Sequence, residues 1–369
     1  MSAIQRLPQV GGTLTIAAGI FAIAGIPSLR QRFTDLLGGG TTGSMLRLLA
    51  VAFALLNLKN LPFVWHWRVF KGLVYQIFLQ KQERTPKDLF APMITSSWNS
   101  LTDCDYNGHK SNATYFTDVD VARAHYVGSV IRTGLQRLNA GDEEGLPAEV
   151  RAVKGKYYVA LGAVGCFFQR EIPPLARFEI YTRILSWDRK WLYLVSHIVK
   201  KGAIKPDSYI LQPWKKGKRA AESKKSDEED LRKHIYATSI ARYVMKKGRL
   251  TVNPEIMLER SRLLPTRPEG VGLPPRTEDS VVPTPAGENT PAGDADVSSP
   301  EKIATEVSSK LGVDALVEGE IEGEDDWTWG QMEAERLRGL KMASHFDQLS
   351  GIHDEIRAGD VLGQYSDWF

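Results

Sequence analysis

Two apolar segments joined by a tight turn constrain the fold of this chain more than any other feature. The first, RFEIYTRILSW at 177–187, alternates between apolar and polar side chains, and the second is KWLYLVSHIVKK at 190–201. A period of two places alternate side chains on opposite faces of a strand. Because the WDRK turn between them is short, the two segments are expected to form an antiparallel hairpin.

Further strands are expected around this hairpin, at 94–103, 156–172 and 234–248. The segment 111–138 has a helical period instead, because apolar residues recur at three- and four-residue steps. One long helix with four or five antiparallel strands predicts an α+β fold in which the sheet wraps the helix. The helical stripe is made by Phe116, Val119, Ala122, Tyr126 and Val130.

The N-terminal region contains two apolar stretches that suggest a membrane anchor. The stretch at 13–27 is shorter than the roughly 20 residues of a spanning helix, and the stretch at 44–67 is interrupted by Arg47 and Lys59. We expect at least one spanning helix within residues 10–80. A buried helical hairpin and a cleaved signal peptide remain the alternatives.

Aromatic and basic residues alternate in the segment that follows, at 63–81. Trp and Tyr beside cations are typical of a segment at a membrane interface. The positive-inside tendency then places the rest of the chain on the cytoplasmic side, predicting an endomembrane protein whose catalytic domain faces the cytoplasm. The basic residues concerned are Arg68, Lys71, Lys81, Arg84 and Lys87.

Composition excludes several classes of function. The 369 residues carry a net charge of +3, which argues against a nucleic-acid-binding protein. The chain has only two cysteines, Cys104 and Cys166, so a disulfide framework or a structural zinc site is not expected.

Changes in composition divide the chain into four parts. Residues 1–88 form the hydrophobic membrane-anchor region, and 89–263 form the α+β domain, with a charged insertion at 203–233. Pro, Gly, Ser, Thr and acidic residues dominate 264–325, which predicts a disordered linker. Residues 326–369 are expected to form an amphipathic helical tail that docks onto the core or onto a partner.

The residues that carry chemistry lie directly before the long helix, in DCDYNGHKSNATYFTDVDVAR at 103–123. This segment resembles the signature of hotdog-fold acyl-CoA thioesterases of the 4-hydroxybenzoyl-CoA thioesterase type. It is most similar to the membrane-anchored group that includes thioesterase superfamily member six. The stretches at 118–134 and 177–199 support the resemblance, which covers about 90–260. It implies a hotdog fold, a homodimer and hydrolysis of an acyl thioester.

The resemblance also implies roles for individual residues. Asp105 is expected to attack the thioester or to act as general base, while His109 and Asn112 orient the carbonyl or the water. N–H groups at the helix N-terminus would polarise the carbonyl. No cofactor is expected, since coenzyme A is part of the substrate. The residues expected to contact substrate are Gly108, Tyr115 and Asp120.

Simpler interpretations of the same residues remain open. Asp105 could serve only as a turn or N-cap residue, and His109 only as a structural hydrogen-bonding group. Cys104, Asp105 and His109 could ligate a metal, but no further ligand cluster supports this and no metal is expected. Because Lys110 and Ser111 depart from the family pattern, the alternative to an acyl-CoA thioesterase is a catalytically weak acyl-binding or scaffold protein at a membrane.

Overall fold

The computed structural model describes most of the chain in two compact units. Unit 1 contains residues 1–64 and 100–102, and unit 2 contains 65–99 and 103–369. The residues described are 42–204, 206–215, 232–268 and 327–355, together with 27, 28, 31, 35 and 364.

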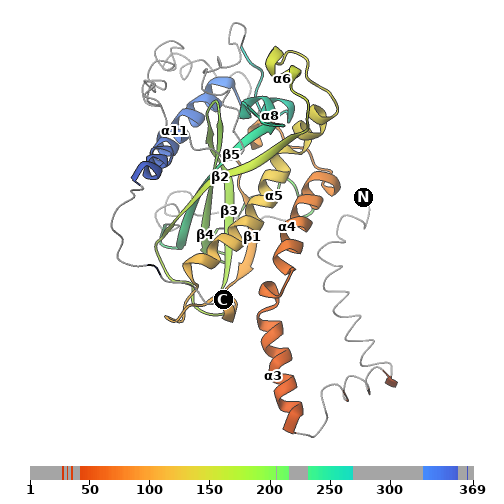
Figure 1. Cartoon of the computed structure of the whole chain (residues 1–369), viewed down its shortest axis with the longest axis vertical. Coiled ribbons are helices and arrows are strands. Elements are labelled where there is room, and N and C mark those ends of the chain that lie inside the picture. Colours follow the sequence, from red (N-terminus) through yellow and green to blue (C-terminus); the bar gives the residue numbers. More distant parts are fainter. Residues whose placement is uncertain are drawn as a thin grey trace. The chain divides into compact units, whose positions relative to one another are not determined.

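An antiparallel sheet forms the centre of unit 2 (Figure 1). Its order is β1-β3-β4-β5-β2, and β6 pairs with β5. The predicted hairpin is confirmed, because Glu179 of β3 pairs with Val199 of β4. The strands are β1 (Met93–Trp98), β2 (Tyr157–Phe168), β3 (Arg177–Trp187), β4 (Trp191–Lys200), β5 (Ile235–Lys247) and β6 (Leu250–Val252).

The long helix α5 (Asn112–Asn139) lies against this sheet. Four residues of its predicted apolar stripe are buried, and the fifth, Phe116, is partly exposed. Tyr126 joins the two layers, since its hydroxyl accepts a hydrogen bond from the Ile184 N–H of β3 at 3.0 Å. Two short helices, α6 (Ala148–Ala152) and α8 (Pro254–Arg260), complete this part of the domain. The expected α+β architecture is present.

A second helical layer covers the other side of α5. Helix α4 (Val64–Val74) continues into a π-helical turn, η3 (Tyr75–Leu79). The η3 turn packs on α5, and Arg68 of α4 donates to Asp118 of α5 at 3.0 Å. Gly72 permits close approach, because a Cβ there would lie 2.8 Å from Cδ2 of His125. The structure therefore assigns residues 65–88 to the unit that holds the sheet, whereas the sequence pattern groups them with the N-terminal region.

The C-terminal helix α11 (Trp329–Gln348) packs on the outer face of the sheet, mainly on β3 (Figure 1). Leu340 and Ala343 join a buried apolar cluster with Leu185 and Tyr193. Residues 329–348 of the predicted tail thus form a helix docked on the sheet, while 356–363 and 365–369 lie outside the described residues. Leu340 and Ala343 are buried, whereas Met342 on the same helix is 60% exposed.

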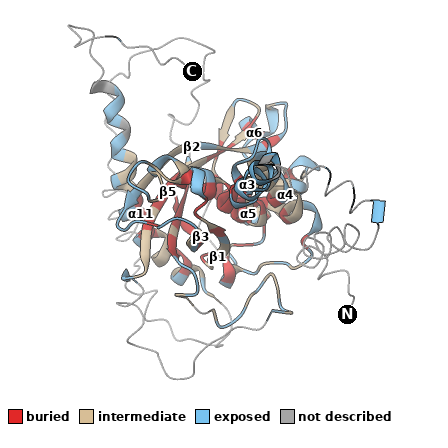
Figure 2. Ribbon diagram, turned by 90° about the horizontal axis from the view of Figure 1, so that it is seen from below, coloured by how far each residue is buried: buried red, intermediate tan, exposed pale blue. Residues whose placement is uncertain are grey.

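Unit 1 contains helix α3 (Thr42–Leu56), which has 15 residues and exposes most of its apolar side chains (Figure 2). At 1.5 Å per residue it is about 22 Å long. No helix in the described part of the chain is both long and apolar enough to cross a membrane. The expectation of a spanning helix within 44–67 is therefore corrected, while the stretch at 13–26 lies outside the described residues.

Two further predictions fall on segments without a described structure. Residues 269–325 of the expected linker and 216–231 of the charged insertion lie outside the described residues.

Candidate active site

The acidic segment in front of α5 folds as a closed loop. Cys104 and Lys110 form an isolated antiparallel bridge, and the Asp105 N–H donates to the His109 carbonyl at 3.0 Å. The Gly108 N–H donates to the Asp105 carbonyl at 3.0 Å, with a Gly108 φ of +77°. Glycine adopts this left-handed conformation without strain. Gly108 is thus required by the turn itself.

The turn brings the carboxylate of Asp105 towards the imidazole of His109. Asp105 Oδ2 lies 3.8 Å from His109 Nδ1, and the two side chains are 24% and 23% exposed. Asp105 Oδ1 accepts a hydrogen bond from the Asn107 N–H at 2.9 Å, which fixes the carboxylate over the turn. The structure therefore brings together two of the three predicted catalytic residues at a partly open surface.

A carboxylate that the sequence pattern does not reveal lies on the far side of the imidazole. Glu171 follows β2, and its Oε1 lies 3.5 Å from His109 Nε2. The Glu171 side chain is 75% exposed. His109 consequently lies between two carboxylates, one from its own loop and one from a segment more than 60 residues away. No local spacing signals this pairing.

The N-terminus of α5 begins immediately after the loop. Ser111 is the N-cap residue, its side chain makes no capping hydrogen bond, and its N–H donates to the Asp103 carbonyl at 2.8 Å. First-turn N–H groups of a helix have no intrahelical acceptor. Asn112, the third predicted catalytic residue, is exposed in this turn. The N–H donors and the Asp105 loop are therefore adjacent along the chain.

Tyr115 is predicted to contact substrate, but it lies in a buried environment rather than in an open groove. Its side chain is buried, with its ring 5.0 Å from that of Phe168 in an edge-to-face arrangement. Burial raises the pKa of the Tyr115 hydroxyl. Burial also raises the pKa of the nearby Cys166 thiol to about 11, so this cysteine is a neutral thiol near pH 7.

Asp120 lies two turns along α5 from the loop and pairs with Arg123. The Asp120 side chain is 35% exposed, whereas the Arg123 side chain is 2% exposed. Among the described residues, Nε and Nη1 of Arg123 have no hydrogen-bond acceptor. Asp120 thus pairs with a buried arginine of its own helix, and the structure does not place it beside Asp105.

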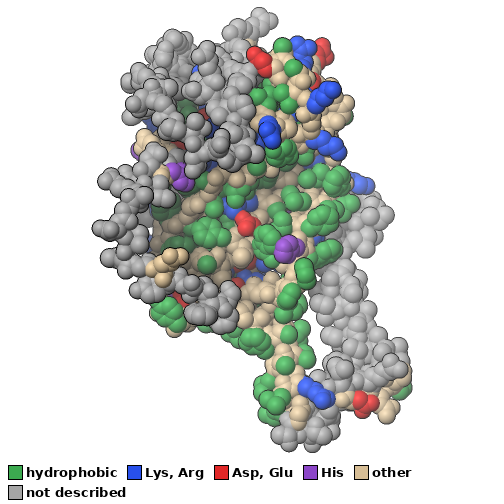
Figure 3. Space-filling model, viewed as in Figure 1, with side chains coloured by type: hydrophobic (Ala, Val, Ile, Leu, Met, Phe, Trp, Pro, Cys, Tyr) green, Lys and Arg blue, Asp and Glu red, His purple; other side chains and the backbone are tan. Residues whose placement is uncertain are grey.

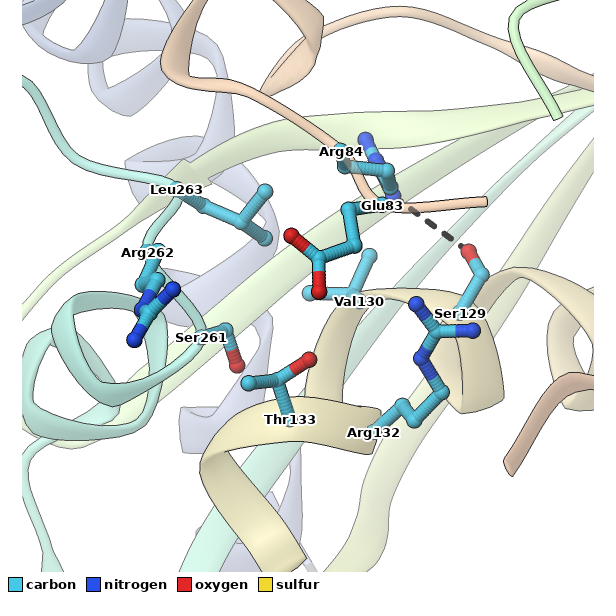
Figure 4. A pocket seen from close by; sticks show the side chains of 9 residues that line it. All are labelled: Glu83, Arg84, Ser129, Val130, Arg132, Thr133, Ser261, Arg262 and Leu263. Carbon is cyan, nitrogen blue, oxygen red and sulfur yellow. Dashed lines mark hydrogen bonds between the residues drawn. The ribbon is translucent and has the colours of Figure 1, made fainter. Parts of the chain in front are cut away.

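A polar pocket lies beside the C-terminal half of α5 (Figure 4). Ser129 is 18 positions beyond Ser111, or about 27 Å along a helix. Figure 4 shows the Glu83 carboxylate directed into this pocket, and Arg84 donates to Ser129. The pocket therefore contains none of the predicted site residues. Within the described residues, no group of three or more histidine, cysteine, aspartate or glutamate side chains is arranged to hold a metal ion.

The arrangement suits attack on a carbonyl carbon. A carboxylate can act as nucleophile or as general base, the imidazole can orient water, and helix N–H groups can stabilise a developing oxyanion. One long helix against an antiparallel sheet of this order, with such a loop at the helix N-terminus, defines a hotdog-fold protein of the thioesterase type.

Comparison with known proteins supports this class. The family described as the thioesterase-like superfamily matches residues 100–224. The probable thioesterase atnL of Emericella nidulans is 31% identical over 338 residues, which cover 86% of this chain and 91% of that protein. Thioesterase poxG of Penicillium oxalicum is 30% identical over 315 residues, covering 84% and 86%. The chain belongs to the thioesterase-like superfamily, which confirms the resemblance found in its motif.

Among solved structures, a 1,4-dihydroxy-2-naphthoyl-CoA thioesterase from Synechocystis is similar over 47% of this chain and 96% of that one. The two are 10% identical, with a TM-score of 0.30.

Proposed function

We propose that the protein hydrolyses an acyl thioester, with acyl-CoA as the substrate class. The observation that carries this proposal is the placing of Asp105 beside His109, directly before the N-terminus of α5, in a member of the thioesterase-like superfamily. Relatives that cover most of the chain are named thioesterases. Coenzyme A would enter as part of the substrate.

In the proposed reaction, Asp105 either removes a proton from the attacking water or attacks the thioester carbonyl to give an acyl anhydride that water then hydrolyses. On both routes the C–S bond breaks, and coenzyme A leaves as a thiolate that takes up a proton. The first-turn N–H groups of α5 stabilise the negative charge that develops on the carbonyl oxygen. His109 and Asn112 orient the water or the carbonyl. Glu171 joins this set, because its carboxylate faces the second nitrogen of His109 and favours the orientation that directs Nδ1 towards Asp105.

Membrane association is part of the proposal. In unit 2, α4 and η3 pack one face on α5 and expose Trp67, Phe70 and Phe78, whose side chains are 63%, 61% and 71% exposed. In Figure 3, apolar side chains gather along the segment that α4 and η3 form. Aromatic side chains beside Lys71 suit the interface of an anionic membrane. An endomembrane location, with the catalytic domain on the cytoplasmic side, follows from the basic residues of this region and stays a prediction.

A homodimer is also proposed. Strand β2 is an edge strand of 12 residues, with Leu161 and Phe167 45% and 60% exposed. A long apolar edge offers unpaired backbone groups to another strand. A second copy of β2 would satisfy those groups and cover these side chains.

The experiment that tests the activity is an assay of the purified protein against acyl-CoAs of different chain lengths. Asp105→Asn removes the nucleophile or base while keeping the size of the side chain, so we expect a loss of about 10²–10⁴ in kcat. Asp142→Asn, at the other end of α5, is the matched control and should keep parental turnover. A fully active Asp105→Asn protein would refute the role of the carboxylate. Binding of acyl-CoA without turnover by the parent would favour the acyl-binding or scaffold alternative.

Membrane association has its own test, sedimentation with vesicles of phosphatidylcholine and phosphatidylserine. Replacing Trp67, Phe70 and Phe78 by serine should reduce the bound fraction at unchanged hydrolysis of a short acyl-CoA. A deletion of residues 1–62 separates the contribution of α3 from that of α4. If neither change lowers binding, the proposed membrane surface is wrong.

A further inference from the structure

The lysine of the motif is buried rather than exposed. The Lys110 side chain is 0% exposed, and its Nζ lies 2.9 Å from Asp118 Oδ2 and 3.3 Å from Asp103 Oδ2. Asp118 Oδ1 in turn accepts from Ser97 Oγ at 2.8 Å and from Arg68 Nη2 at 3.0 Å. We call these five residues, Arg68, Ser97, Asp103, Lys110 and Asp118, the buried charge cluster.

The cluster brings buried charges of opposite sign into contact. Two cations face two carboxylates, and both carboxylate side chains are at most 2% exposed. Removing a charge from water is expensive unless a partner of opposite sign compensates it. The Lys110 ammonium also lies 5.4 Å from the centre of the Tyr115 ring and 5.5 Å from that of Phe178. Its position is therefore set by ionic partners and by aromatic rings together.

The cluster lies directly behind the loop that carries Asp105. Asp103 stands at the start of this loop, and Lys110 stands at its end, immediately after His109. The ion pair between Asp103 and Lys110 therefore fastens one end of the loop to the other. The pair with Asp118 fastens the loop to α5, on the second turn from the helix N-terminus.

We propose that Lys110 is a positioning residue, which holds the Asp105 loop in register with the N–H donors of α5. This role rests on the proposed thioesterase activity. Lys110 does not touch substrate; it acts through the loop. Misplacing a reacting group by about 1 Å can cost roughly 10²-fold in rate. Loss of the Lys110 ion pairs should therefore lower the rate of hydrolysis more than it lowers the fraction of folded protein.

Backbone contacts explain why the loop should survive loss of the ammonium. The Lys110 N–H donates to the Ile172 carbonyl at 3.0 Å, and the Ser111 N–H donates to the Asp103 carbonyl at 2.8 Å. A side-chain substitution leaves both bonds in place. The loop then keeps its course but loses the ionic contacts that fix its distance from α5.

The central test compares Lys110→Met with Arg68→Met. Methionine keeps the length of the lysine side chain without its charge, and each variant removes one cation from Asp118. Only Lys110→Met also releases the loop. We expect kcat to fall about tenfold or more in Lys110→Met, with KM within about threefold, and to stay within about threefold in Arg68→Met. Parental kcat per folded molecule in Lys110→Met would overturn the proposal, even if its Tm falls.

A second variant keeps the proposal testable if Lys110→Met does not fold. In Lys110→Met/Asp103→Asn, one carboxylate of the cluster is neutralised together with the ammonium, and Asp118 keeps its contact with Arg68. We expect this double variant to fold and to retain the low kcat. Recovery of parental kcat would show that the ammonium has no positioning role.

A readout that does not depend on turnover separates this proposal from the proposed function. Cys104 lies inside the loop, with its Sγ 3.4 Å from Asn99 Nδ2. In a Cys166→Ala background, Lys110→Met should speed labelling of Cys104 by a disulfide reagent about fivefold or more, because a loop that keeps its average course but lacks these ionic contacts opens transiently more often. Arg68→Met should not speed it. If the parent hydrolyses no acyl-CoA, the thioesterase function fails, while the labelling rates still decide whether Lys110 holds the loop. Equal rates in both variants would refute that hold.

Discussion

Gly339 of α11 lies on the backbone of Leu185 in β3, so closely that an added Cβ would come within 2.0 Å of the Leu185 carbonyl oxygen. Leu185 stands at the point where the register between β3 and β4 shifts, between Ile184 and Ser186. Such a bulge turns backbone groups out of the regular ladder. The helix approaches the sheet at this irregularity, and only a residue without a side chain fits there.

Gly339→Ala should therefore loosen α11 from the sheet. The added methyl group meets backbone atoms that cannot move aside, and overpacking of this kind costs about 1–3 kcal/mol. Hydrogen exchange should rise across Trp329–Gln348, and the urea midpoint should fall. Gly351→Ala is the matched control, because within the described part of the chain no residue beyond its sequence neighbours comes within 4 Å of the added Cβ. Equal exchange in the two variants would contradict this packing.

Tyr126→Phe should destabilise the domain without changing its shape. The Tyr126 hydroxyl accepts from the Ile184 N–H at 3.0 Å and donates to the Leu89 carbonyl at 3.3 Å. Phenylalanine leaves both buried backbone groups without this partner, at a cost of about 1–3 kcal/mol in the free energy of unfolding. Tyr158→Phe should cost far less, because the Tyr158 hydroxyl donates to the Gly248 carbonyl at an exposed position. Equal losses in urea denaturation would argue against a special role for Tyr126.

Stability should fall in mild acid because of His125. Burial first, and then Lys71 and Arg68, lower the pKa of His125 below its usual 6.5. The unfolded chain then binds a proton that the folded chain does not, so the free energy of unfolding decreases as the pH drops from 6.5 through the folded pKa. His125→Gln should reduce this slope between about pH 7 and pH 5, measured by urea denaturation.

Two comparisons complete this test. Burial and Arg183 lower the pKa of His197 in the same direction, so His125→Gln should remove only part of the slope. His345→Gln, on the exposed side of α11, serves as the control and should retain the parental slope. A parental slope in His125→Gln would contradict the assignment.

Leu161→Lys should weaken the proposed dimer. Leu161 is 45% exposed on the edge strand β2, and a lysine there would place a charge in the expected interface. Light scattering should show a shift from dimer to monomer, with the melting temperature of the monomeric domain little changed. Leu175→Lys, equally exposed at 47% but outside the strands, is the control. A monomeric parent would refute the dimer itself.

Strong periodicity made the sheet and its helix predictable. The strand expected at 177–187 is β3 without change, and the helix expected at 111–138 is α5 within one residue at each end. In these elements one face is buried along its whole length, so apolar residues recur with the period of a strand or of a helix. Helix α4 was less predictable, because aromatic residues interleaved with cations suit a membrane interface and also suit a helix with one face on α5 and one face exposed.

The candidate site was predictable only where it is local. The spacing of Asp105, Gly108 and His109 specifies one turn, so the motif alone brings the carboxylate to the imidazole. Glu171 arrives from the end of β2, and Lys110 finds Asp118 through a side chain that points inward. The Glu171 contact depends on how distant elements pack, whereas the Lys110–Asp118 contact spans only eight residues and depends on both side chains being buried.

The docking of α11 also has a consequence for the order of synthesis. Strands β3, β4 and β5 are complete at Lys247, but the helix that covers their outer face ends at Gln348. At the usual translation rate, about 100 residues take roughly 5–20 s. Throughout that interval α11 does not yet cover Leu185, Tyr193 and Ile240 on the outer face of the sheet. Nascent chains on neighbouring ribosomes of the same messenger RNA can then contact these apolar side chains.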